Sequence, residues 1–162
     1  MRFVLAAFLA IFVSTTSAAD DLEAGRKAYN AGAYDEALKH WLPLADARHP
    51  EAAVYVGSMF DFGLGTAQDR NSAAKYYRVA ITGGNHEAKV RLGVLIANMN
   101  GDQSAEKEAV RLIMEAYEAA PEDPLTLMGR GFIEEKGVAR QPSLANALPF
   151  YEKAAERGDE SA

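Results

Sequence analysis

The sequence contains no cysteine among its 162 residues. Disulfide bonds, zinc sites built from thiolates and a cysteine nucleophile are therefore excluded. Positive charge is also in short supply, because 17 basic residues stand against 23 acidic ones and the net charge is −6. No run of five or more like charges and no basic stripe occurs. Such a chain is repelled by nucleic-acid phosphates and anionic lipid headgroups, so we expect no nucleic-acid partner.

Long hydrophobic segments are lacking as well. The longest uninterrupted apolar run covers residues 3–13, which is 11 residues, whereas a membrane-spanning helix needs about 20. The run follows Arg2, and small residues follow it up to Ser-Ala-Ala at 17–19. A positive start, an apolar middle and a small-residue end are typical of a secretory signal. We predict a cleaved signal peptide over residues 1–19, a mature chain from Asp20 without a membrane span, and a periplasmic or secreted location.

What the sequence does contain is an internal repeat. Glycines recur at a step of 36 residues, at Gly57, Gly93 and Gly129. Alanines follow the same step, at Ala37, Ala73, Ala109 and Ala145. Each alanine precedes a bulky site, at Trp41, Tyr76-Tyr77, Ile113 and Phe150-Tyr151. A period of this length is the signature of stacked repeat units.

Each unit has the pattern of two helices joined by a turn. The first helix carries apolar residues at helical spacing, and its repeated glycine lets two helix backbones approach closely. Glycines at 63 and 65 end that helix, and Asp69 or Ser72 caps the second one. A single pair cannot bury its apolar stripe, so neighbouring pairs must stack. We predict an all-α fold, an α-solenoid of about four antiparallel helix pairs over residues 20–162, with units at 20–50, 51–85, 86–122 and 123–160.

This pattern resembles the Sel1-like repeat family, which is related to the tetratricopeptide repeats. The second unit carries the family's positions at Ala52, Gly57, Phe60, Gly65, Asp69, Ala73, Tyr76-Tyr77, Ala80 and Gly84. The fourth carries them at Gly129, Phe132, Gly137-Val138, Phe150-Tyr151, Ala154-Ala155 and Gly158. The resemblance implies a right-handed superhelix whose first helices line a concave face for a protein or peptide partner, without a cofactor.

In the resembling families, the concave face carries residues at −3, +1, +4 and +5 from the repeated glycine. Transferred to this chain, these offsets give a candidate partner groove made of Arg26, Tyr29, Asn30, Val54, Ser58, Asp61, Phe62, Val90, Val94, Ala97, Asn98, Thr126, Arg130, Ile133 and Glu134. A groove with an apolar middle and charged ends suits an extended or helical peptide. The alternative is that these residues are merely solvated or pack against neighbouring first helices. The resemblance thus implies an exported adaptor or scaffold.

No catalytic or metal-binding motif accompanies the repeat. The three histidines, His40, His49 and His86, lack the spacing of metal ligands. Ser58 precedes Asp61 by three residues, but no nucleophile elbow and no Ser-x-x-Lys motif is present. We therefore predict a non-enzymatic protein with neither metal nor cofactor.

Two alternatives to the adaptor stay open. Cysteine-rich exported Sel1-like proteins have been linked to β-lactam binding or hydrolysis, so the resemblance also implies a β-lactamase-like hydrolase, although this chain lacks their cysteines. The second alternative is a self-assembling structural module. The last residues, 158–162, resemble the start of a further first helix without a capping helix, which predicts an exposed apolar end. Three interpretations of that end stay open: it packs on a partner, it packs on a second copy and so forms a homo-oligomer, or the sequence is a fragment.

Overall fold

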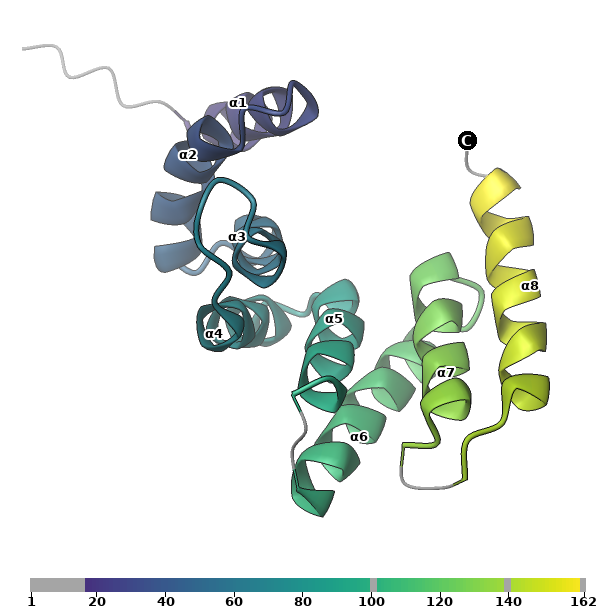
Figure 1. The fold of residues 1–162 in the computed structure, drawn as a ribbon. Coiled ribbons are helices and arrows are strands. Elements are labelled where there is room, and N and C mark those ends of the chain that lie inside the picture. The colour runs from purple at the N-terminus through teal and green to yellow at the C-terminus, as the bar shows by residue number, and fades with distance from the viewer. Residues whose placement is uncertain (1–16, 100–101, 139–140, 161–162) are drawn as a thin grey trace, which may run out of the picture.

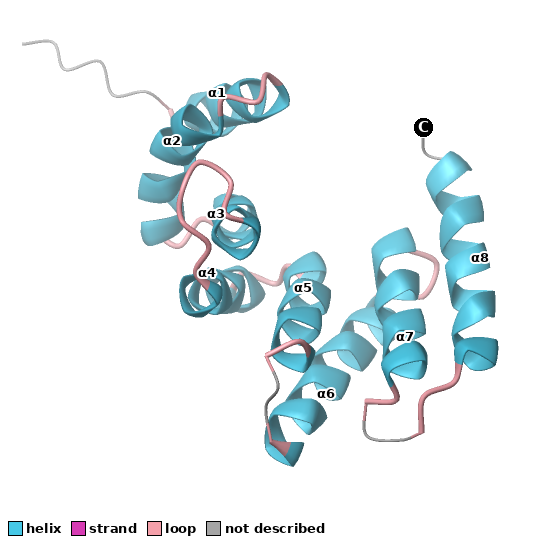
Figure 2. Cartoon of the chain, viewed as in Figure 1, coloured by secondary structure: helices cyan, strands magenta, loops and turns pink. Residues whose placement is uncertain are grey.

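The computed structural model describes residues 17–99, 102–138 and 141–160. These ranges contain eight helices and no strand, which confirms the all-α prediction (Figure 2). The helices are α1 (Ala18–Asn30), α2 (Tyr34–Asp46), α3 (Pro50–Phe62), α4 (Arg70–Thr82), α5 (His86–Ala97), α6 (Gln103–Ala119), α7 (Pro124–Lys136) and α8 (Leu144–Glu160). None of the helices in these ranges combines the length and the apolar character that crossing a bilayer requires.

The helices are stacked in pairs along an arc (Figure 1). Within each pair the two helices pack closely, α1 on α2, α3 on α4, α5 on α6 and α7 on α8. Adjacent pairs then meet through α2 and α3, α4 and α5, and α6 and α7, while the first helices α5 and α7 also touch. Contacts between neighbouring pairs are the arrangement of a repeat solenoid. The predicted α-solenoid is therefore confirmed.

Local sequence signals set the helix ends. The Asp69 carboxylate accepts hydrogen bonds from the backbone N–H groups of Asn71 and Ser72 at 2.9 and 3.2 Å, so Asp69 caps α4 as predicted. Gly63 ends α3 with φ of 69°, a left-handed conformation that favours glycine. His49 accepts from the N–H of Ala52 and so caps α3.

A glycine occupies the eighth position of all four first helices, at Gly25, Gly57, Gly93 and Gly131. Three of them face a bulky side chain 20 residues later in the second helix. A Cβ on Gly57 would lie 2.7 Å from the Tyr77 ring, and one on Gly93 would lie 2.6 Å from the Ile113 side chain. These distances are too short for real atoms. The glycine therefore makes room mainly for a buried side chain, rather than for the close approach of two backbones that the sequence pattern predicts.

The fourth unit has a different register from the predicted one. The glycine that faces Tyr151 is Gly131, where an added Cβ would lie 2.7 Å from the Tyr151 ring. At the repeated alanine position of this unit, the buried residue is Ala147, whereas Ala145 is exposed. The glycine step is therefore 38 residues here (131 − 93), not 36. The extra residues precede α7, because α6 has 17 residues where α4 has 13.

The predicted signal peptide falls mostly on residues 1–16, which lie outside the described ranges. The first described helix, α1, begins at Ala18, and the Ser17 side chain caps it by accepting a hydrogen bond from the Ala19 N–H at 3.3 Å. The predicted cleavage position before Asp20 thus lies within the first turn of α1.

Candidate partner-binding groove

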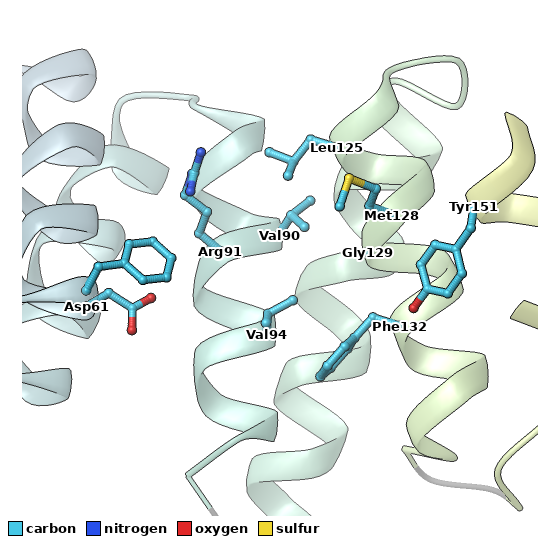
Figure 3. A pocket seen from close by; sticks show the side chains of 10 residues that line it. Asp61, Val90, Arg91, Val94, Leu125, Met128, Gly129, Phe132 and Tyr151 are labelled. Atoms are coloured by element: carbon cyan, nitrogen blue, oxygen red, sulfur yellow. The ribbon is translucent and has the colours of Figure 1, made fainter. Parts of the chain in front are cut away.

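The first helices α5 and α7 enclose an apolar pocket of about 320 Å³. We name it the α5–α7 pocket, lined by Asp61, Phe62, Val90, Arg91, Val94, Leu125, Met128, Gly129, Phe132 and Tyr151. Figure 3 shows Val90 and Val94 of α5 on one side, with Leu125 and Met128 of α7 on the other. A concave apolar site with a few polar groups at its edge is the usual form of a binding site.

Helical spacing places these side chains together. Val90 and Val94 are four residues apart, and Leu125, Met128 and Phe132 are separated by three and four, so each set lies along one face of its helix. Gly129, between them, has no side chain to fill the space. A Cβ there would lie 2.8 Å from Val90 Cγ1, so the glycine lets α7 pack closely against Val90.

Two large apolar side chains at this pocket are exposed to solvent. Phe62, at the end of α3, has 63% of its surface exposed, and Met128 has 52%. A contiguous patch of large apolar side chains on a protein surface usually marks a site that binds a partner. The exposed apolar surface therefore continues from the pocket onto α3.

Two further hollows extend the pocket in both directions. One, of about 640 Å³, reaches the N-terminal ends of α5 and α7 and shares Arg91 and Leu125 with the pocket. The other, of about 390 Å³, lies toward Gln68 and Arg70 and shares Phe62 with it, together with Asp61 and Val94. The three hollows form one continuous surface across α3, α5 and α7, which we name the inner groove.

Charged side chains in the inner groove differ in how fully neighbouring groups stabilise their charge. The Arg91 guanidinium binds Glu87 Oε1 through its Nη2 and Nε atoms at 2.6 and 2.7 Å. Asp61 Oδ2 accepts a hydrogen bond from the neutral Tyr77 hydroxyl at 3.4 Å. Burial raises the pKa of Asp61 above its ordinary value, although Tyr77 and the charges of Arg70 and Arg91 act in the opposite direction. The Asp61 carboxylate is thus incompletely stabilised.

The tyrosines next to the groove have a structural role. Burial is the main reason that the pKa of Tyr77 rises to about 12, and its hydroxyl lies 3.2 Å from Ser58 Oγ. The pKa of Tyr151 also rises to about 12, through burial and the hydrogen bond that its hydroxyl donates to Glu135 at 2.8 Å. Both phenols therefore stay protonated at neutral pH.

The groove contains some of the residues that the sequence predicted for it. Asp61, Phe62, Val90 and Val94 line the α5–α7 pocket, and Asn98 lines the hollow toward Arg70. The predicted residues of α1 lie elsewhere. Arg26 pairs with Glu23 and Glu51 at 3.6 and 3.5 Å, Tyr29 packs against Trp41 with ring centroids 5.7 Å apart, and Asn30 is exposed at the end of α1.

Two predicted residues of α3 do not line the inner groove. Val54 is buried in the core, and the half-buried Ser58 lies beside the Tyr77 hydroxyl. Ala97, on α5, is half-buried and packs against the core.

The residues predicted on α7 are wrong as exposed groove residues. Glu134 is only 2% exposed and forms an ion pair with Arg130. The Arg130 guanidinium lies over the Phe150 ring, 4.9 Å from its centroid, while Thr126 and Ile133 are buried.

The cause of this wrong prediction is the two-residue shift of the fourth unit. Counted from the structurally equivalent glycine at 131, the offsets −3 and +1 give Met128 and Phe132, which do line the pocket.

Sequence reasoning also missed Arg91, Leu125 and Tyr151. A signal for the correct register was present, because Pro124 starts α7 seven residues before Gly131 just as Pro50 starts α3 seven residues before Gly57. Counting from the helix start rather than from the nearest matching glycine leads to Met128 and Phe132.

The histidines take part in local contacts. His40 Nδ1 lies 3.2 Å from Asp21 Oδ1 and links α2 to α1, and His86 borders the hollow at the N-terminal end of α5. Within the described ranges, no three His, Asp or Glu side chains gather in a way that could hold a metal ion.

Two solved structures resemble this fold. One is a Sel1 repeat protein from Oxalobacter formigenes, with 27% identity and a TM-score of 0.63 over 86% of this chain and 56% of that one. The other is c5321, a protective antigen of uropathogenic Escherichia coli strains with an SLR fold, with 21% identity and a TM-score of 0.62 over 90% of this chain and 32% of that one. The chain thus spans just over half of the first protein and about a third of the second. No protein-family model and no curated protein sequence matches it.

Proposed function

Because the chain is an all-α solenoid of the Sel1-like repeat type, we propose that it is an exported, non-enzymatic adaptor that binds a protein or peptide partner in the inner groove. The observation that carries the proposal is the apolar α5–α7 pocket with the exposed side chains of Phe62 and Met128 at its edge. Repeat solenoids typically use such extended concave surfaces for binding.

The apolar content of the groove supports a polypeptide partner. Burying one large apolar side chain contributes about 1.5–3 kcal/mol, so covering Phe62 and Met128 and filling the pocket supplies enough favourable free energy for a specific contact. The pocket is open at both ends into further hollows. A continuous groove of this form suits a peptide segment that lies across α3, α5 and α7, with one apolar side chain inserted into the pocket.

Export is a separate part of the proposal and rests on the sequence of residues 1–19. Expression of the whole chain in a bacterial host, followed by mass measurement of the protein recovered from the periplasm, tests it. We expect a chain that begins at Asp20. Recovery only from the cytoplasm, with the first 19 residues retained, would contradict export.

Site-specific photo-crosslinking tests the groove itself. A benzoylphenylalanine placed at Met128 samples the groove, and the same residue at Met99 is a matched control, because Met99 is 40% exposed and lies outside the inner groove. We expect a crosslinked polypeptide of defined mass from position 128 in the native envelope and none from position 99. Equal crosslinking from both positions would contradict the groove assignment.

Self-assembly through α8 is a second candidate, because two leucines one helical turn apart are exposed there. Leu144 is 66% exposed and Leu148 is 49% exposed. A crosslinker at Leu148 distinguishes the candidates, since self-assembly yields a product of twice the chain mass. A concentration-independent monomer mass by light scattering would exclude this second candidate.

A further inference from the structure

The charges of the inner groove are not balanced. Asp61 and Arg91 line the α5–α7 pocket, and the hollow at the N-terminal ends of α5 and α7 adds Glu87 and Asp123. Three carboxylates and one guanidinium give these two hollows a charge of −2 when His86, which also borders them, is neutral, and Arg70 in the third hollow brings the whole inner groove to −1. A surface with an apolar centre and net negative charge is complementary to a segment that carries both apolar and basic side chains.

Asp61 is the carboxylate best placed to meet such a basic group. Arg91 already has Glu87 as its partner at 2.6 Å. Asp61, by contrast, accepts a long hydrogen bond from Tyr77 and forms no ion pair with any residue in the described part of the chain. It also lies in the wall that the pocket shares with the neighbouring hollow, next to Phe62.

The titration behaviour of Asp61 agrees with this geometry. Its pKa is raised because the loss of hydration outweighs the hydrogen bond from Tyr77 and the attraction of Arg70 and Arg91. An additional positive charge brought by a partner would offset that loss. A positive charge placed near Arg91 would gain no such compensation. The guanidinium would repel it, and the nearby Glu87 carboxylate already binds that guanidinium.

We infer that the groove selects a polypeptide segment in which a basic residue adjoins a large apolar one, with the apolar side chain in the α5–α7 pocket and the cation at Asp61. This inference rests on the proposed function and specifies its ligand class. Arg70 lines the neighbouring hollow together with Asp61 but does not line the α5–α7 pocket, so its charge disfavours a cation in that hollow relative to one in the pocket.

Two short peptides test the inference, N-acetyl-Phe-Lys-amide and N-acetyl-Phe-Glu-amide. Each is titrated into methyl-labelled protein, and the shifts of the Val90, Val94 and Met128 methyl signals give the dissociation constants. We expect the lysine peptide to bind about fivefold more tightly, because a part-exposed ion pair contributes on the order of 1 kcal/mol. Asp61→Asn should reduce this ratio to about one, whereas Glu118→Gln, an equal charge change at an exposed site on α6, should leave it unchanged.

The outcomes separate the inference from the proposed function. Equal binding of both peptides, preference for the glutamate peptide, or a ratio that survives Asp61→Asn would each overturn the inference while leaving the pocket as a binding site. Absence of any methyl shift with either peptide would overturn both. Phe132→Ala should weaken both peptides alike, since it removes a wall of the pocket and no charge.

Discussion

Replacing Gly57 by alanine tests the packing on which every unit depends. The new Cβ would lie 2.7 Å from two carbons of the Tyr77 ring, which is fully buried and cannot move into solvent. Overpacking of a core costs about 1–3 kcal/mol. The better helix propensity of alanine returns about 1 kcal/mol, and displacement of the Tyr77 hydroxyl from Ser58 and Asp61 costs about 1 kcal/mol more. We expect a net loss of about 1–3 kcal/mol.

Urea unfolding followed by circular dichroism measures this loss, and a second glycine supplies the control. Gly158 lies in α8, and nothing lies within 4 Å of the position that its Cβ would take. Gly158→Ala should therefore leave stability unchanged or raise it by up to about 1 kcal/mol. A Gly57→Ala variant as stable as Gly158→Ala would refute the pairing of this glycine with Tyr77.

Three further predictions follow from the same structure. Ala147→Leu should cost about 1–3 kcal/mol because Ala147 is fully buried, while Ala145→Leu should change stability by less than about 0.5 kcal/mol. Thermal unfolding measures both, and a larger loss for Ala145→Leu than for Ala147→Leu would support the 36-residue step instead. Arg130→Ala should cost about 1.5–3 kcal/mol in the same assay, since it removes one charged hydrogen-bond partner of the buried Glu134; a purely surface Arg130 would give almost no change. Burial raises the pKa of Asp61 in the folded chain, so its ionisation opposes folding at neutral pH and this penalty disappears as the pH falls through that pKa. Asp61→Asn should therefore be more stable than the unmodified chain at pH 7 and equally stable in acid, and a difference of opposite sign at pH 7 would contradict the assignment.

Much of the architecture was predictable because repeated residues in this chain have a single structural cause. A glycine that faces a bulky residue 20 positions later recurs at Gly57 with Tyr77 and at Gly93 with Ile113. Since that pair fixes how the two helices of a unit cross, its repetition along the sequence indicates stacked helix pairs. Helix ends were predictable for the same reason, because Asp69 and Gly63 act through local backbone geometry.

The site was less predictable, because a concave surface depends on register as well as on repeat number. The first helix of the fourth unit, α7, contains two glycines, Gly129 and Gly131, and only the second faces Tyr151. Choosing the first moved the predicted residues by two positions, which on a helix turns them by about 200°. Thr126 and Arg130 were therefore expected where Met128 and Phe132 lie. The shift comes from the longer α6. In the sequence, extra residues in this helix look the same as extra residues in the loop that follows it.

The most direct test of the inner groove is the affinity of the crosslinked partner for two truncations to alanine, one inside the groove and one outside it. Once the polypeptide captured at position 128 is identified, calorimetric titration with Phe132→Ala and Leu148→Ala compares the α5–α7 pocket with the exposed face of α8. We predict at least about a tenfold loss of affinity for Phe132→Ala, as is usual for a large side chain at the centre of an interface, and a change of less than about twofold for Leu148→Ala. Loss of affinity only with Leu148→Ala would contradict the inner groove as the partner site.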